Sequence, residues 1–204
     1  SANCLKLPDN VDYEEGSFTD PVSVGLHAVR KCRMEAGKTA AVFGLGAIGF
    51  ICVQWLRALG CTKVIAVDVA DDKLALAKRL GATAGVNGMK TDAVAAIKEL
   101  TGGYGCDIYI EASGHPSSVQ QGLDCIRKMG RFVEFSVFGQ PVTVDWSIIS
   151  DRKELDLLGV HLSPFCYDTV IEWIGNGKLP TDGVVTHKFP LEKWEEGFHI
   201  AKTG

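Results

Sequence analysis

The sequence predicts an α/β fold, a doubly wound sheet of six parallel strands with helices on both faces. Short, mostly apolar runs alternate along the chain with longer segments in which apolar residues recur at helical spacing. Glycine or a polar cluster separates most of these runs from the next. Such an alternation is typical of a parallel sheet that is covered by helices on both sides.

The clearest part of the pattern is a strand, a glycine-rich turn, a helix and a second strand. The run Ala40–Phe43 leads into Gly44-Leu-Gly-Ala-Ile-Gly49, after which apolar residues follow a helical period. Gly60 ends this helix, residues 63–67 form a buried strand, and Asp68 follows directly. Together these features are the dinucleotide-binding fingerprint of a Rossmann fold.

Each residue type in the fingerprint has a chemical reason. Gly44 permits a tight turn, Gly46 lets backbone amides approach a pyrophosphate, and Gly49 lets the helix lie close to the strand. Asp68 can accept hydrogen bonds from the adenosine ribose, and its charge would repel a 2′-phosphate, so we expect NAD rather than NADP. A mononucleotide or S-adenosylmethionine site, which uses a similar turn and acid, is the alternative.

The remaining elements follow the same alternation. Residues 1–17 are polar and acidic and are interpreted as a connection, and Asp20 is the predicted N-cap of a helix that ends near Gly37. The other predicted elements are a helix from 71 to 80, a strand at 82–86, a helix at 91–100, a strand at 106–112, a helix with Val119, Leu123 and Ile126 inward, strands at 130–137 and 154–160, and helices at 165–174 and 190–201.

Ligands of doubly wound sheets lie across the carboxyl ends of the strands. We therefore expect the nicotinamide half of the cleft to be lined by Ser113-Gly114, Ser136-Val137 and the residues after Gly159. The alternative for each is an ordinary strand-to-helix turn. Glu111 and Glu134 interrupt apolar strands. Because a buried unpaired carboxylate is costly, we expect both to have hydrogen-bond partners.

Composition limits the classes of function. The 204-residue chain has a net charge of −4 and no cluster of Lys and Arg, which gives no support for nucleic acid or an anionic membrane as a partner. Its seven cysteines are scattered and mostly lie in apolar segments, as expected for reduced packing residues of a cytoplasmic protein. Without a Cys-x-x-Cys pair, a structural zinc site within the chain is not expected.

Several motifs occur in a specific order: Asp20-Pro-Val-Ser-Val24, the Gly44–Gly49 turn, Asp68 with Lys73, Glu111-Ala-Ser-Gly114, and Phe189-Pro-Leu-Glu-Lys-Trp-Glu-Glu-Gly-Phe198. In this order they resemble the cofactor-binding half of zinc-dependent medium-chain alcohol and polyol dehydrogenases. Within that family the chain is most similar to sugar-alcohol enzymes such as sorbitol dehydrogenase and to threonine dehydrogenases. Residues 156–163 and 180–187 favour erythritol/threitol-type enzymes.

The resemblance implies a set of contacts to NAD. These are Gly44, Gly46, Ala47, Ile48 and Gly49 at the pyrophosphate, Asp68, Val69 and Lys73 at the adenosine ribose, Ser113 and Gly114 at the adenosine and ribose wall, and Phe135, Ser136, Val137, Val160 and Leu162 on the nicotinamide side. No catalytic residue is expected in this chain. Asp20 stands where polyol-type members have a glutamate beside the catalytic zinc, so it is a candidate zinc-proximal residue, with an N-cap role as the alternative.

The resemblance also implies a domain organisation. Residues 1–19 would be a connecting segment from a separate catalytic domain that supplies the zinc ligands, and residues 20–204 would be the NAD-binding Rossmann domain. The intact enzyme would bind zinc, oxidise a secondary alcohol of a small alcohol or polyol to a ketone by hydride transfer to NAD, and form a homodimer or homotetramer through this domain. This chain alone would bind cofactor without turnover.

Two other readings stay open. One is a zinc-independent medium-chain reductase that uses NADPH, against which Asp68 speaks. The other is a non-enzymatic Rossmann module that senses NAD, which the chain would also satisfy.

Overall fold

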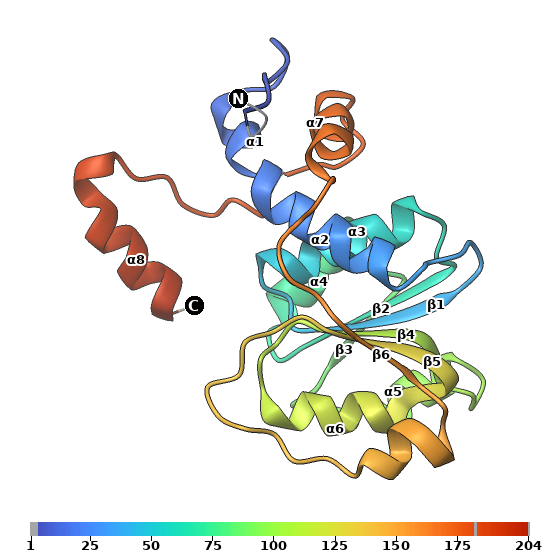
Figure 1. Ribbon diagram of the computed structural model, residues 1–204. Helices are drawn as coiled ribbons and strands as arrows, with labels where there is room; N and C mark the ends of the chain where they lie inside the picture. The colour runs from blue at the N-terminus through green and yellow to red at the C-terminus, as the bar shows by residue number, and fades with distance from the viewer. Residues whose placement is uncertain (1–3, 182, 204) are drawn as a thin grey trace.

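The computed structural model describes residues 4–181 and 183–203. Within them, six parallel strands form one sheet in the order β3-β2-β1-β4-β5-β6, which confirms the predicted doubly wound topology. Figure 1 shows this sheet between two layers of helices. The strands are β1 (Thr39–Phe43), β2 (Lys63–Asp68), β3 (Ala84–Asn87), β4 (Cys106–Glu111), β5 (Ile126–Glu134) and β6 (Asp156–Gly159).

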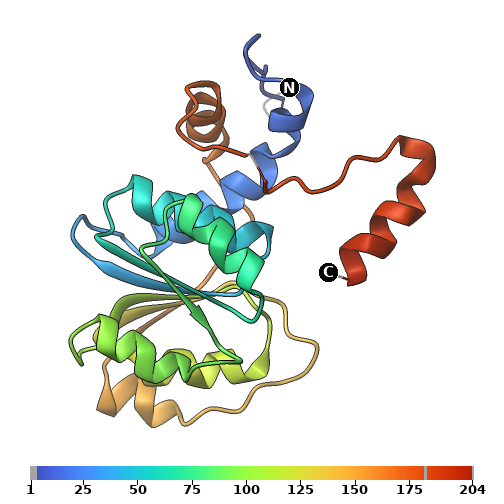
Figure 2. The same ribbon diagram turned by 180° about the vertical axis from the view of Figure 1, so that it is seen from behind.

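Helices cover both faces of the sheet and bury a separate apolar cluster on each (Figures 1 and 2). One face carries α2 (Thr19–Lys31), α3 (Ala47–Ala58), α4 (Asp71–Arg79) and, beside α2, α7 (Tyr167–Gly175). The other face carries α5 (Ala93–Leu100) and α6 (Pro116–Cys125). The burial of these two clusters is the main stabilising contribution to the fold.

The central strands β1 and β2 are buried on both faces, which is why their sequences are continuously apolar. Val42 belongs to the cluster under α2 and α3, whereas Ala41 and Phe43 belong to the cluster under α5 and α6. At the carboxyl ends of the two strands, the Gly44 amide donates to the Val67 carbonyl at 2.9 Å. The turn after β1 is therefore held against the end of β2.

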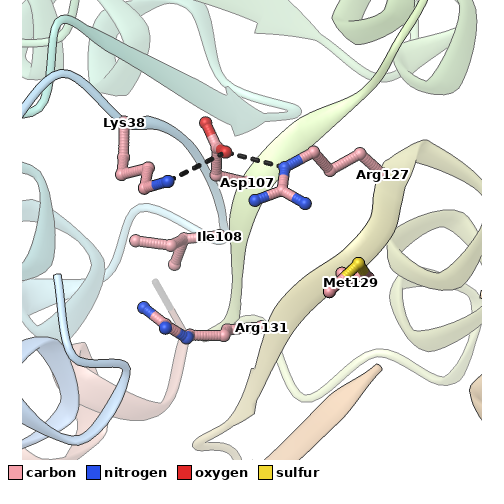
Figure 3. A pocket seen from close by; sticks show the side chains of 6 residues that line it. All are labelled: Lys38, Asp107, Ile108, Arg127, Met129 and Arg131. Carbon is pink, nitrogen blue, oxygen red and sulfur yellow. Dashed lines mark hydrogen bonds and ion pairs between the residues drawn. The ribbon is translucent and has the colours of Figure 1, made fainter. Parts of the chain in front are cut away.

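At the amino ends of the strands, opposite the glycine-rich turn, charged side chains connect the start of β1 with β4 and β5 (Figure 3). Asp107 accepts a hydrogen bond from Arg127 Nε at 2.7 Å and from the amide and hydroxyl of Thr39 at 2.8 Å each. Lys38 Nζ lies 3.9 Å from the same carboxylate, and Arg131 donates to two backbone carbonyls just after α2. These groups satisfy one another, so this cluster is structural.

The first helix of the sheet domain differs from its prediction at the start. α2 begins at Thr19, and its N-cap residue, Phe18, makes no side-chain capping bond. Asp20 therefore lies inside the first turn, and its predicted N-cap role is wrong. Its carboxylate instead accepts a hydrogen bond from the Tyr167 hydroxyl of α7. Packing of α7 against α2, which the local sequence does not show, determines what this side chain contacts.

The end of α2 and several strand boundaries also differ. α2 ends at Lys31, before the predicted end near Gly37, because Arg33 leaves the helical region with a φ of 45°. The predicted boundaries of the third, fifth and sixth strands shift to those given above. Ile126 is predicted on the inner side of a helix. It instead lies in β5 and pairs with Cys106 of β4, next to a register shift in the β4–β5 ladder.

The ends of the chain add further elements. The predicted connection contains a short helix, α1 (Tyr13–Ser17), which begins at a capping box formed by Asp12 and Glu15. A π-helical turn (Ile148–Arg152) precedes β6, and a 3₁₀ turn (Leu191–Lys193) precedes α8 (Trp194–Thr203), which stands apart from the sheet in both views (Figures 1 and 2). No helix in the described ranges is long and apolar enough to cross a membrane.

Candidate cofactor-binding site

Three glycines connect β1 to α3, and the structure separates their roles. Gly44 has a φ of 90°, and a Cβ there would lie 2.6 Å from the Cα of Ser113. A Cβ at Gly49 would lie 1.9 Å from the carbonyl oxygen of Gly44. A Cβ at Gly46 would meet no atom within 4 Å. The fold itself thus requires Gly44 and Gly49, whereas Gly46 leaves a space that a ligand can approach.

The beginning of α3 is suited to an anion. Gly46 is its N-cap residue and has no side chain to bond the first amides of the helix, and Ala47 is exposed. The amides of a helix's first turn have no intrahelical partner, and the helix dipole places partial positive charge there. The turn therefore offers the donors that a pyrophosphate needs.

Asp68, at the end of β2, is bonded to the glycine-rich turn. Its Oδ2 accepts the Leu45 amide at 2.7 Å, and its Oδ1 accepts the amides of Val69 at 2.8 Å and Ala70 at 3.0 Å. The carboxylate is only half-buried and lines a cleft. Its remaining lone pair, on Oδ2, can accept a hydrogen bond from a ribose hydroxyl.

The adenosine cleft, as we call it, has a volume of about 370 Å³ and lies at the carboxyl ends of β1, β2 and β4. Among its lining residues are four of the predicted contacts: Gly44, Asp68, Val69 and Ser113. Sequence reasoning misses a wall formed by the loop after β3, the start of α5, and α6 with its N-cap residue. Its residues are Gly88, Met89, Ala93, His115, Ser117, Ser118 and Gln121. For Gly88, Met89 and His115, the position just beyond a strand end is a signal that could have identified them.

A second cleft, of about 270 Å³, shares Ser113 with the adenosine cleft and lies beyond β4 and β5. Six predicted contacts line it: Ile48, Ser113, Gly114, Phe135, Ser136 and Val137. Val24 of α2 and Ala112 complete the wall and were not among the predicted contacts. The glycine-rich turn and Ser113 thus stand between two cavities, as a molecule with two nucleoside halves requires.

Six predicted contacts are not among the residues that line either cleft. Three of them, Gly46, Ala47 and Gly49, lie at the start of α3. Lys73 is exposed on α4, Val160 is half-buried after β6, and Leu162 is 62% exposed with a φ of 53°. The two clefts therefore bring Gly44, Ile48, Asp68 and Val69 together with the predicted residues after β4 and β5. The predicted residues after β6 do not line these clefts.

Glu111 is fully buried at the end of β4 and is satisfied by the turn that follows. It accepts the amides of Ser113 at 2.9 Å and Gly114 at 3.2 Å, the Ser118 hydroxyl at 2.6 Å, and the Ser113 hydroxyl. The expected hydrogen-bond partners are thus present. This carboxyl group holds the turn that separates the two clefts.

Glu134 occupies the corresponding place at the end of β5, where its Oε1 accepts the Ser136 amide at 3.0 Å. Burial raises the pKa of Glu134 to about 7, against the lowering effect of that amide, and neighbouring Glu111 adds to the rise. Glu134 can therefore change its charge near neutral pH.

Metal binding has no complete site in the described residues. None of their His, Cys, Asp and Glu side chains form a group of three or more that could hold a metal ion. Asp20, the candidate zinc-proximal residue, has its carboxylate bonded to the Tyr167 hydroxyl. These residues do not constitute a zinc site by themselves.

The comparisons with known proteins agree on one family. The sequence profile described as "Zinc-binding dehydrogenase" matches residues 47–176. The chain is 46% identical over 199 residues to erythritol/L-threitol dehydrogenase of Mycolicibacterium smegmatis, covering 98% of this chain and 55% of that protein. It is 36% identical to L-threonine 3-dehydrogenase of Bacillus velezensis (99% and 59% covered) and 30% identical to sorbitol dehydrogenase of Bacillus subtilis (96% and 55%). The chain thus spans little more than half the length of these curated relatives.

Solved structures agree with this fold. An Escherichia coli oxidoreductase/dehydrogenase of unknown specificity superposes with a TM-score of 0.92 at 30% identity, with 96% of this chain and 56% of that one covered. A zinc-binding dehydrogenase from Sinorhizobium meliloti, solved with NADP, has a TM-score of 0.83 at 31% identity, with 87% and 53% covered.

Proposed function

The chain belongs to the zinc-binding dehydrogenase family, and we propose that it is the NAD-binding half of an enzyme that oxidises a secondary alcohol, most simply of a polyol, to a ketone. The observation that carries the proposal is Asp68, which lines the adenosine cleft and bonds the glycine-rich turn through Leu45. When bound, NAD would supply the hydride acceptor. The residues of this chain would bind and orient it.

The proposed orientation follows from the two clefts. The adenosine would occupy the cleft of Asp68, the pyrophosphate would contact the amides at Gly46 and Ala47, and the nicotinamide would occupy the second cleft beside Phe135 and Ser136. Lys73, Val160 and Leu162 stay part of the proposed contact set, at its outer margin.

The preference for NAD over NADP rests on charge. A carboxylate at the ribose would repel a 2′-phosphate, and Val69, the next residue, is 64% exposed and carries no positive charge. One structural relative was solved with NADP, so the titration described below compares the two cofactors directly.

The whole protein would contain more than this chain covers. We propose that residues 1–19 connect to a further domain, that residues 20–204 are the NAD-binding domain, and that the zinc ligands come from that further domain. Asp20 would lie beside the zinc there. The relatives named for polyols favour a small alcohol or polyol as the substrate.

Subunit pairing is proposed through the edge of the sheet. β6 is the last strand of the sheet order, so one side of it has no strand partner within the described chain. Leu162 and Phe165, which follow it, are 62% and 99% exposed. A homodimer or homotetramer that continues the sheet across a two-fold axis would cover this region.

The decisive test is a parallel titration of the purified chain with NADH and NADPH, following energy transfer from its four tryptophans. We expect saturable binding of NADH and binding of NADPH at least about tenfold weaker, a difference of about 1.4 kcal/mol. Equal or tighter binding of NADPH would favour the reductase alternative. Binding of S-adenosylmethionine or ATP, with neither dinucleotide bound, would overturn the assignment.

A second measurement addresses catalysis. The full-length protein, given NAD and a panel of erythritol, threitol, sorbitol and threonine, should form NADH with at least one polyol. If the full-length protein binds NAD and oxidises no alcohol, the NAD-sensing alternative would replace the dehydrogenase.

A further inference from the structure

Helix α6 presents a polar face to the adenosine cleft. Ser117, Ser118 and Gln121 of this helix all line the cleft, and residues three or four positions apart lie on the same side of a helix. Leu123, by contrast, is buried in the apolar cluster on the α5–α6 face of the sheet. The cleft therefore meets a strip of side chains on α6 that can form hydrogen bonds.

The serine hydroxyls of this wall already have partners within the protein. Ser118 donates to Glu111 at 2.6 Å, and the Ser117 hydroxyl lies 2.8 Å from Nδ1 of His115. Ser113, which lines the cleft from the turn after β4, also donates to Glu111 and accepts the His115 amide at 3.1 Å. These bonds hold the turn and the start of α6 in place.

Gln121 differs from the serines, because its amide has no hydrogen-bond partner among the described residues while its side chain is half-buried at the cleft. The preceding residue, Gln120, is exposed, does not line the cleft, and donates to Asp124 at 3.0 Å. A primary amide carries an acceptor oxygen beside a donor nitrogen. A ligand group with one donor next to one acceptor would therefore satisfy Gln121.

The other side of the cleft suits the flat face of an aromatic ring. In the sheet, β2 and β3 lie on one side of β1, and β4, which leads into α6, lies on the other. Val69 after β2 and Met89 after β3 line the cleft, and both are exposed apolar side chains. A methionine sulfur also makes favourable contacts with aromatic rings. The cleft thus combines apolar side chains for the face of a base with a polar strip for its edge.

His115 adds a second donor to the polar strip. Its Nδ1 accepts the Ser117 amide at 3.3 Å, so the neutral ring carries its proton on Nε2. This Nε2 has no hydrogen-bond partner among the described residues, and His115 is an exposed residue of the cleft wall. Of the two unpaired groups, the neutral His115 ring can only donate, whereas Gln121 can also accept.

Adenine has an edge that matches the Gln121 amide. Its 6-amino group donates, the adjacent ring nitrogen N7 accepts, and a glutamine amide can pair with both at once. We propose that Gln121 selects the adenine base of the cofactor, with its amide oxygen accepting from the amino group and its amide nitrogen donating to N7. The inference rests on the proposed function, because it requires the adenosine of NAD in this cleft.

The experiment compares NADH with reduced nicotinamide hypoxanthine dinucleotide, in which an oxygen replaces the 6-amino group. Because that oxygen is an acceptor, the amide oxygen of Gln121 would lose its donor. The dissociation constant of the hypoxanthine analogue should be roughly fivefold to 150-fold larger than that of NADH. Energy transfer from the tryptophans measures both constants.

Gln121→Met should bring the ratio of the two dissociation constants close to one, chiefly by weakening NADH binding. Methionine has a similar length and a similar helix propensity but no amide. Gln120→Met is the matched control, because it removes the same amide from the neighbouring position outside the cleft, and it should keep the wild-type ratio. Should Gln121→Met not fold, Gln121→Ala removes the same group and should give the same ratio.

The outcomes separate the two proposals. Equal affinity of the wild-type chain for the two dinucleotides, or an unchanged ratio in the Gln121 variants, would overturn the role of Gln121 and leave the cofactor site intact. Failure of the wild-type chain to bind NADH, the hypoxanthine analogue and ADP-ribose would overturn the proposed function, and this inference with it.

Discussion

The backbone amide of Leu45 donates a 2.7 Å hydrogen bond to Oδ2 of Asp68. One carboxylate thus ends β2, holds the glycine-rich turn after β1 and lines the adenosine cleft. Because the same group stabilises the turn and is proposed to bind the ribose, changes at Asp68 should affect both cofactor binding and stability.

Asp68→Asn should weaken NADH binding about tenfold, because it keeps the size of the side chain and removes its charge. The ratio of the NADPH to the NADH dissociation constant should become smaller for the same reason. The free energy of unfolding should fall by about 1 to 3 kcal/mol, because the amide oxygen can keep the bonds from Val69 and Ala70 whereas the amide nitrogen cannot accept the Leu45 amide. Tryptophan quenching and urea unfolding measure the two effects. Asp72→Asn, an exposed acid on α4, is the control. An unchanged NADH/NADPH ratio would contradict the placement of Asp68 at the ribose.

Ala substitutions at Gly46 and Gly49 should have opposite effects. At Gly49 a Cβ would be 1.9 Å from a backbone oxygen, so Gly49→Ala should lower the free energy of unfolding by about 2 kcal/mol or more. At Gly46 a Cβ has free space, so Gly46→Ala should fold normally and weaken NADH binding at least about tenfold. Thermal unfolding and NADH titration of both variants make the comparison. Full NADH affinity in Gly46→Ala would exclude close approach of a pyrophosphate.

The cluster around Asp107 should make part of the stability depend on pH (Figure 3). Burial acts to raise the pKa of Asp107, but the Thr39 and Arg127 hydrogen bonds outweigh it, so the pKa lies below its ordinary value. A lowered carboxyl pKa contributes stability that is present above the unfolded pKa of about 3.9 and is lost as the pH falls through the folded pKa.

Asp107→Asn should therefore lower the free energy of unfolding by about 1 to 3 kcal/mol at pH 7 and reduce the loss of stability below about pH 4. Urea unfolding at several pH values measures both. Asp145→Asn is a control of the same type at an exposed ion pair, and it should change stability less. Parallel stability curves for Asp107→Asn and the wild type would show that this cluster is not linked to acid denaturation.

Leu157→Asp should weaken the proposed pairing of subunits. Leu157 is 44% exposed on the edge strand β6, and a charge there would meet its own copy across a two-fold axis. Sedimentation should show a dimer or tetramer for the wild type and mostly monomer for the variant. Leu191→Asp, at an exposed site before α8, should leave assembly unchanged. A wild-type chain that is monomeric at high concentration would remove the basis for this interface.

Sequence reasoning succeeds where the signal is local. The strands and helices agree with their predictions in kind and in order along the chain, because apolar periodicity and glycine positions are properties of short segments. The strand order in the sheet also agrees, and it was inferred from the dinucleotide-binding fingerprint. It fails at Asp20 and Ile126. Asp20 bonds Tyr167 of α7, and Ile126 pairs with Cys106 of β4. Both outcomes depend on elements distant in the chain.

The candidate site shows the same division. By itself, the sequence determines the glycine-rich turn after β1, the acid at the end of β2 and the serine-containing turns after β4 and β5. Only the tertiary structure decides that Asp68 bonds Leu45, that Met89 and His115 complete the adenosine cleft, and that Glu111 and Glu134 stand side by side. The physical reason is that periodicity is set by neighbours along the chain, whereas register and cleft walls are set by the packing of separate strands and helices.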